Sequence, residues 1–308
     1  MGLLIIISII IIGFVLVNWL IIWRNYFKYT KRIAFLFLTV SDVKQAPIWE
    51  IFFKGHTNKF NIYVHPKHPN KIKSFFKDHI IQNLVPTEWG DTSLVVATNN
   101  LIREALDNPA NQKFILVSDS CVPIKTFEYV YKTVLQDNTS WFNYYSPQPS
   151  VTPKPDWMGE KNTHYESLNL LYSNFRKNAF IQEQWMILDR RHAELIDDNR
   201  NLLHYFNIEG IFPDEIYYIT ILHTLIKKTK GHFKFRRHSR KKYKKHKYIT
   251  QAKWTKGRQS LHPEEFELLT KADIRLLKTS PALFARKFTE SSDIGDHWQT
   301  IVKTPTPL

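Results

Sequence analysis

Residues 33–40 read IAFLFLTV, a continuous apolar run that ends in Thr39 and is followed by Ser41. A short run without alternation of apolar and polar residues is typical of a strand covered on both faces, as in a parallel sheet. The run KFILVS at residues 113–118 has the same character, and FNIYV at residues 60–64 lies between the two. The sequence therefore predicts three buried strands of one sheet.

Segments with helical spacing of apolar residues alternate with these strands. Residues Ser93 to Leu106 form the clearest predicted helix, and Asn108-Pro109 marks its end. Alternating strands and helices predict an α/β fold with a mostly parallel central sheet flanked by helices. The other predicted elements are helices at residues 46–54, 72–83, 127–135, 191–197 and 213–225, and a short strand at residues 184–188.

Polar side chains follow the predicted strands at their carboxyl ends, where open α/β sheets bind ligands. Ser41, His65 and Asp119 occupy these positions, and we expect them to contact a bound nucleotide. Neither a GxGxxG nor a GxxxxGK[ST] motif is present. The sequence therefore does not support a dinucleotide-dependent dehydrogenase or a P-loop enzyme.

Two acidic residues beyond the second strand allow two interpretations. Glu88 and Asp91 flank Trp89-Gly90, directly before the helix that begins at Ser93. They either contact hydroxyl groups of the donor ribose or sugar, or they cap this helix through its free backbone N–H groups. The sequence is consistent with both hypotheses.

The composition restricts the other functional classes. The chain has 308 residues, a formal net charge of +15 and one cysteine, Cys121, so an intramolecular disulfide is excluded. Its position after a predicted strand favours a small buried side chain over a thiol nucleophile. Of the 43 Lys and Arg residues, 15 lie between Lys227 and Arg258, so the positive charge is local.

This basic tract, residues 227–258, has several interpretations. It is either a solvated loop or a contact for anionic membrane headgroups, an acidic glycan or nucleic acid. No helix-turn-helix, zinc-finger or RNA-recognition signature accompanies it in the sequence. Nucleic acid is therefore not the expected partner.

The N-terminal segment is predicted to be a membrane anchor. Leu3 to Trp23 is an almost unbroken apolar run without charged residues, long enough as a helix to cross about 30 Å of hydrocarbon. No basic residue precedes the run and no small-residue cleavage site follows it, which favours an uncleaved anchor over a signal peptide. The basic residues at 24–32 follow the anchor and would place that flank in the cytoplasm.

A series of motifs, in their order and spacing across about residues 33–290, resembles the core-2/I-branching family of N-acetylglucosaminyltransferases. The motifs are PIWEIFF at 47–53, FNIYVHP at 60–66, EWG at 88–90, KFILVSDSCVP at 113–123, QWMIL at 184–188, PDE at 213–215 and LFARKF at 283–288. This resemblance implies a GT-A-like single domain at residues 33–290. It would follow an anchor at residues 1–23 and a basic stem at residues 24–32, and it would precede a C-terminal tail at residues 291–308.

The resemblance also implies a reaction and roles for individual residues. The family transfers a sugar, N-acetylglucosamine in its animal members, from a UDP-sugar to a glycan or glycoprotein acceptor with inversion. The matching motifs make Glu215 the catalytic base and place Lys287 at the donor diphosphate. Arg258 is a weaker match to a second diphosphate-binding residue, and Trp254 and Trp185 are assigned to the acceptor.

The chemistry of inverting transfer is consistent with these residue types. An acceptor hydroxyl needs a base as the new bond forms, and a single carboxylate is sufficient. The sequence has no Asp-x-Asp motif, so we expect no metal or other cofactor; Arg286, Lys287 and Arg258 would stabilise the leaving diphosphate instead. The simpler alternatives are that Glu215 caps a helix and that Arg286 and Lys287 are a solvated basic pair.

Function and localisation follow as expectations. The first hypothesis is a metal-independent, single-pass membrane glycosyltransferase, of the type II Golgi or ER kind by resemblance, although the basic flank conflicts with that orientation. The competing hypothesis is a membrane-tethered binding protein with a degenerate transferase fold, which would use the basic tract for anionic partners. Retention of both Glu215 and the cations near residue 287 favours the enzyme.

Overall fold

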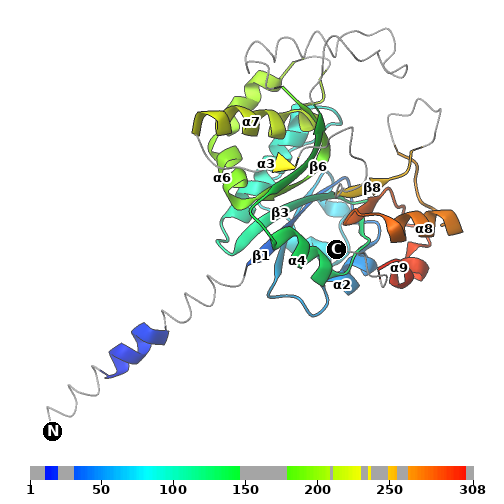
Figure 1. The fold of residues 1–308 in the computed structure, drawn as a ribbon, viewed down its shortest axis with the longest axis horizontal. Coiled ribbons are helices and arrows are strands. Elements are labelled where there is room, and N and C mark those ends of the chain that lie inside the picture. Colours follow the sequence, from blue (N-terminus) through cyan, green and yellow to red (C-terminus); the bar gives the residue numbers. More distant parts are fainter. Residues whose placement is uncertain are drawn as a thin grey trace.

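The computed structural model describes residues 11–19, 31–145, 179–208, 211–229, 235–236, 249–254 and 263–302 (Figure 1). The strands are β1 (Arg32–Thr39), β2 (Phe60–Pro66), β3 (Asn111–Ser118), β4 (Val122–Pro123), β5 (Ser140–Tyr145), β6 (Ile181–Asp189), β7 (Phe235–Arg236), β8 (Thr250–Ala252) and β9 (Phe284–Arg286). The α-helices are α2 (Ala46–Phe53), α3 (Thr92–Leu106), α4 (Phe127–Leu135), α6 (Arg190–Asp198), α7 (Tyr217–Thr229), α8 (Lys271–Thr279) and α9 (Ile294–Val302).

The central sheet has six strands in the order β2-β1-β3-β6-β5-β7. Strand β1 pairs in parallel with both β2 and β3, as the apolar runs predict. Strand β6 is antiparallel to β3 and to β5, so the sheet is mixed and the prediction of a mostly parallel sheet needs this correction. A buried strand is apolar in either direction, and for that reason the sequence pattern did not reveal the reversal.

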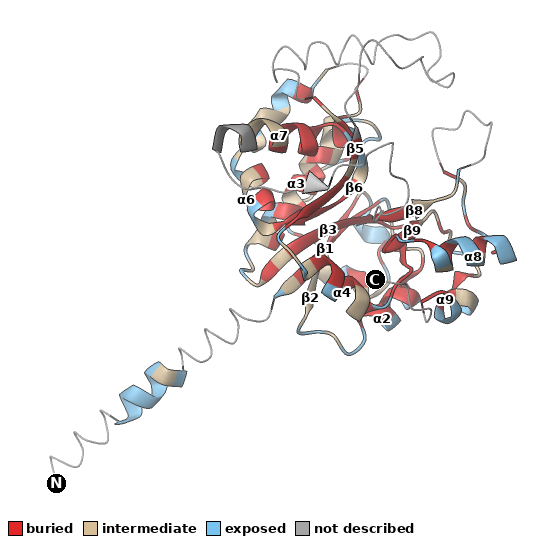
Figure 2. Ribbon diagram, in the orientation of Figure 1, coloured by how far each residue is buried: buried red, intermediate tan, exposed pale blue. Residues whose placement is uncertain are grey.

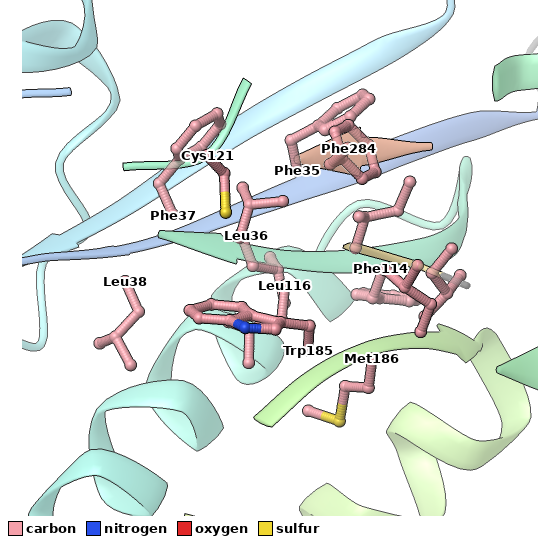
Figure 3. Close-up of a cluster of buried hydrophobic side chains, with 14 of the residues drawn as sticks. Phe35, Leu36, Phe37, Leu38, Phe114, Leu116, Cys121, Trp185, Met186 and Phe284 are labelled. Carbon is pink, nitrogen blue, oxygen red and sulfur yellow. The ribbon is translucent and has the colours of Figure 1, made fainter. Parts of the chain in front are cut away.

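The buried residues lie along the strands and the inner faces of the helices (Figure 2). Phe35 and Phe37 of β1 make edge-on contacts with the ring of Trp49 in α2, at centroid distances of 6.1 and 4.9 Å. Figure 3 shows Phe35, Phe37 and Cys121 on one side of these strands, and Leu116 and Trp185 on the other. Cys121 is fully buried, which supports its interpretation as a core residue.

A small second sheet, in the order β4-β9-β8, lies beside the end of β3. Strand β4 pairs with β9 through Val122 and Ala285. The backbone N–H of Phe288 then donates to the carbonyl of Ser120 at 3.0 Å. These pairings bring residues 284–288 of the chain against the loop that follows β3.

Two predicted boundaries differ from the structure. The predicted helix at residues 72–83 is absent; a 3-10 turn, η2 (Phe75–His79), occurs there, and the chain then extends beside β2, where the N–H of Ile81 donates to the carbonyl of Val64 at 3.0 Å. The domain also continues past residue 290. Helix α9 packs against it, and the indole N–H of Trp298 donates to the carbonyl of Pro123 at 2.7 Å.

Most of the predicted anchor and basic tract lies outside the described residues. Residues 11–19 are helical. Within the parts of the chain that the structure describes, no helix combines the length and apolar character needed to span a bilayer.

Candidate active site

A cavity of about 880 Å³ opens where the loops after β1, β2 and β3 meet the ends of β6 and β9. It lies at the carboxyl ends of the parallel strands, the position that α/β sheets use for ligands. Its walls contain both acidic and basic side chains. Those used below are Glu183, Asp214, Glu215, Arg286, Lys287 and Lys44.

Glu215 is held in the cavity wall by a short 3-10 turn, η5 (Pro213–Glu215), that precedes α7. The sequence predicts a helix from Pro213; the structure has this turn first, because the N–H of Glu215 bonds to the carbonyl of Phe212 at 3.0 Å. Asp214 is buried beneath the turn, whereas the side chain of Glu215 is exposed to the cavity. The turn therefore directs Glu215 toward any bound ligand.

The surroundings of Glu215 make it a stronger base than a free carboxylate. Partial desolvation by the surrounding protein, together with the negative charges of Asp214 and Glu183, raises the pKa of Glu215 to about 7, and Arg286 partly opposes this. Burial also raises the pKa of Asp214 to about 6. A carboxyl group with a pKa near the working pH is suited to general base catalysis.

Glu183 is a second acidic residue of the cavity, on β6. Its carboxylate accepts a hydrogen bond from the side-chain amide of Asn143 on β5. Desolvation by the surrounding protein raises the pKa of Glu183, although its side chain remains open to the cavity. The two strands thus fix Glu183 on the same side of the cavity as Glu215.

Arg286 provides positive charge at the centre of the site. Its guanidinium carbon lies 4.5 Å from the centroid of the Trp185 ring, a cation–π contact. Favourable charge interactions reach Asp119, Glu183 and Glu215, while burial lowers its pKa. Within the described part of the chain, the Nε of Arg286 is buried and has no hydrogen-bond partner, while the residue lines the cavity.

Lys287 and Lys44 add positive charge beside Arg286. Burial, with the repulsion from Arg286 and Lys44, lowers the pKa of Lys287. Asp119 organises this side of the cavity, because its carboxylate accepts the N–H of Val40 at 3.1 Å and its carbonyl accepts the N–H of Lys44 at 3.0 Å. Three clustered cations next to backbone from two strand ends are suited to a diphosphate.

The structure brings together most of the residues predicted from sequence. Seven of them line one cavity: Ser41, Asp119, Trp185, Glu215, Trp254, Arg286 and Lys287. Arg258 lies outside the described residues.

The other three predicted residues have structural partners instead. His65 is fully buried, and its Nε2 accepts the backbone N–H of Val85 at 3.0 Å. Asp91 caps α3 by accepting the N–H of Ser93 at 2.7 Å, which is the capping alternative considered above. Glu88 forms an exposed ion pair with Lys67 at 3.0 Å.

Sequence reasoning missed several cavity residues. Lys44 lies beyond the carboxyl end of β1, as Ser41 does, so its position in the sequence could have indicated it. Trp89 belongs to a quoted motif but received no role. Glu183 carried no sequence signal, because nothing along the chain indicates that it lies next to Glu215.

No metal site is evident among the residues that the structure covers: they contain no group of three His, Cys, Asp or Glu side chains suitably placed for an ion. Three further carboxylates, Asp119, Glu265 and Glu290, line the cavity together with the cations described above.

Comparison with known proteins gives the family. The model of the Core-2/I-Branching enzyme family matches residues 33–279. The chain belongs to this family. It is 30% identical over 183 residues to glycosyltransferase BC10 of Oryza sativa subsp. japonica, an alignment that covers 57% of this chain. The aligned region spans 42% of the length of BC10.

Solved structures resemble the chain only distantly. A glycosyltransferase involved in glycosylation of the major capsid of PBCV-1 is 10% identical with a TM-score of 0.41, covering 87% of this chain and 98% of that one. The protein A197 from STIV has a TM-score of 0.25 at 10% identity, covering 53% and 67%. These scores are too low to support an argument.

Proposed function

We propose that the chain is an inverting glycosyltransferase that moves a sugar from a UDP-sugar to a hydroxyl group of a glycan or glycoprotein. The observation that carries the proposal is Glu215, a carboxylate with a pKa of about 7 that faces a cavity also containing Arg286. A base and cations in one cavity are the two kinds of group that a displacement at an anomeric carbon requires.

In this proposal Glu215 accepts the proton of the acceptor hydroxyl as its oxygen attacks the anomeric carbon. The bond from that carbon to the diphosphate oxygen breaks in the same step, so the sugar is transferred with inversion. Asp214 and Glu183 sustain the basicity of Glu215 through charge repulsion. The protonated Glu215 then loses its proton to solvent through the open cavity.

The leaving diphosphate gains negative charge, and Arg286, Lys287 and Lys44 would neutralise it. Arg286 is held in place by Trp185, so little rotational freedom is lost on binding. We propose that these cations do this work without a metal. The proposed donor sugar is N-acetylglucosamine. We also propose that residues 3–23 hold the protein in a membrane as a type II anchor.

The test uses the full chain, purified in mild detergent and incubated with individual UDP-sugars in EDTA. Release of UDP from one donor, increased by a glycan acceptor, is the expected result. Glu215→Gln should reduce the rate by at least about 100-fold without weakening UDP binding, because only the base is lost. The matched control is Glu267→Gln, an exposed glutamate outside the cavity, which should retain full activity.

Other outcomes would identify an alternative. Transfer by Glu215→Gln at the parental rate would exclude this residue as the base. Tight UDP-sugar binding without release across a broad acceptor panel would indicate a binding protein on a transferase fold. Activity that disappears in EDTA and returns with a divalent ion would overturn metal independence.

A further inference from the structure

Trp89 has unusual exposure for so large an apolar side chain inside a cavity. It lines the cavity and is 63% exposed, on the loop between β2 and α3. An aromatic face that is held open in a concave site is a common platform for apolar faces of ligands, including the C–H groups of sugar rings. A second exposed tryptophan, Trp254, also lines the cavity.

The position of Trp89 is fixed from below. Its ring packs against Phe212 with centroids 5.1 Å apart and planes inclined by 59°. Gly90 makes this approach possible: it has a φ of +73°, and a Cβ at this position would lie 2.9 Å from the Phe212 ring. The loop can therefore present Trp89 as a rigid surface.

The surface of Trp89 is connected through Phe212 to the proposed base, Glu215, and not to the cations. Phe212 directly precedes the turn at residues 213–215, and its carbonyl accepts the N–H of Glu215 at 3.0 Å. A ring stacked on Trp89 would thus rest on the same support that positions Glu215. The group that must touch the base is the acceptor hydroxyl, so this support belongs to the acceptor side.

The charge on this side is negative. Glu183, Asp214 and Glu215 all line the cavity, and Glu215 is linked to Trp89 through Phe212. Arg286 offsets part of the charge of Glu183 and Glu215, so the three carboxylates remain in excess over this one cation. Carboxylates accept hydrogen bonds from sugar hydroxyls and repel carboxylate groups. Glu183 has one oxygen engaged by Asn143, which fixes the carboxylate for this task.

We infer that Trp89, supported by Phe212, and Glu183 form an acceptor subsite for an uncharged pyranose ring, and that this subsite rejects uronic and sialic acids. The inference rests on the proposed function and names the acceptor class that the sequence left open. Trp89 binds the apolar face of the ring, Glu183 binds its hydroxyl groups, and Glu215 receives the proton of the reacting hydroxyl.

The experiment measures direct binding to the full chain by saturation-transfer NMR titration, with methyl β-galactopyranoside and methyl β-glucuronide as probes and UDP in separate titrations. The neutral glycoside should bind at least about fivefold more tightly than the glucuronide. Trp89→Ala should weaken the neutral probe at least about fivefold, while Trp89→Phe should stay within about threefold of the parent. Glu183→Gln should reduce the discrimination against the glucuronide.

Tyr205→Ala is the matched control, an exposed aromatic residue that does not line the cavity, and it should bind both probes like the parent. Circular dichroism and melting curves confirm that each variant is folded. Unchanged affinity in Trp89→Ala, equal binding of the two probes, or a loss confined to UDP affinity would overturn the subsite. Binding as expected in a chain that transfers no sugar from any donor would refute the proposed function and leave the saccharide site standing.

Discussion

The guanidinium of Arg286 lies over the indole ring of Trp185, with its central carbon 4.5 Å from the ring centroid. The two residues come from different sheets, Arg286 from β9 and Trp185 from β6. Their contact joins the two sheets in the wall of the cavity. It also orients the charge of Arg286, which forms no ion pair among the described residues. The geometry is specific to a planar cation, because only a guanidinium both stacks and donates from its edge.

Replacing this cation by lysine should therefore be costly. Arg286→Lys keeps the charge but loses the planar contact and the Nε donor, so we expect the KM for the UDP-sugar to rise at least about tenfold. Steady-state kinetics at varied donor concentration would measure it. Arg275→Lys, an exposed position on α8, is the control; equal kinetics for both variants would contradict the assigned role of Arg286.

The pH dependence of the rate should report Glu215. The base works only when ionised, and its pKa is about 7, so kcat/KM should fall about tenfold per pH unit below that value. Glu183→Gln removes a negative charge that raises this pKa, and the acid limb should move to lower pH. An unchanged acid limb in this variant would show that Glu183 does not affect the ionisation of Glu215.

Asp214 should destabilise the fold at neutral pH. Its pKa is raised from 3.8 to about 6, so the folded state favours the protonated form; stability is complete below the unfolded value and is lost as pH rises through about 6. Asp214→Asn should add about 3 kcal/mol to the free energy of unfolding at pH 7.5 and almost nothing at pH 4. Urea unfolding at both pH values measures the difference.

The control for this experiment is Asp78→Asn, an exposed aspartate. It should change stability by less than about 0.5 kcal/mol at either pH. A pH-independent gain in Asp214→Asn would show that packing, not ionisation, is responsible.

A buried ion pair should stabilise the junction of β3 with β6. The Nζ of Lys113 lies 3.4 Å from the carboxylate of Asp189 and donates to the carbonyl of Thr139 at 2.8 Å, with both side chains nearly inaccessible. Lys113→Met leaves Asp189 unpaired and should cost about 3–5 kcal/mol in urea unfolding. Adding Asp189→Asn, which can still cap α6, should recover a substantial part; no recovery would mean that the packing of Lys113 dominates.

How well the sequence predicts each element depends on how far apart in the chain the interacting residues lie. The strand at residues 33–40 and the helix at residues 127–135 were predicted within a residue, because the patterns of apolar residues that identify them are local. The helix expected at residues 72–83 does not form, because Ile80 and Ile81 pair with Val64 of β2, which lies outside the local sequence. Local patterns do not contain such a partner.

The candidate site shows the same division. Glu215 and Lys287 were identified through motifs, and both line the cavity. His65 was expected to follow a strand as Ser41 does, but it lies within β2, buried, and accepts a hydrogen bond from the backbone N–H of Val85. Which polar side chain at a strand end turns toward the ligand is decided by the loop that covers it, and that loop comes from elsewhere in the chain.

The cavity has a consequence for how the protein is made. Its walls extend from Leu38 to Glu290, and the pairing of Val122 with Ala285 joins segments separated by more than half of the chain. Such distant contacts form slowly, because closing a long loop costs conformational entropy before the contact stabilises the chain. During ribosomal synthesis the parallel strands emerge first, and the part of the cavity wall that contains Arg286 and Lys287 is completed only after β9 has been made.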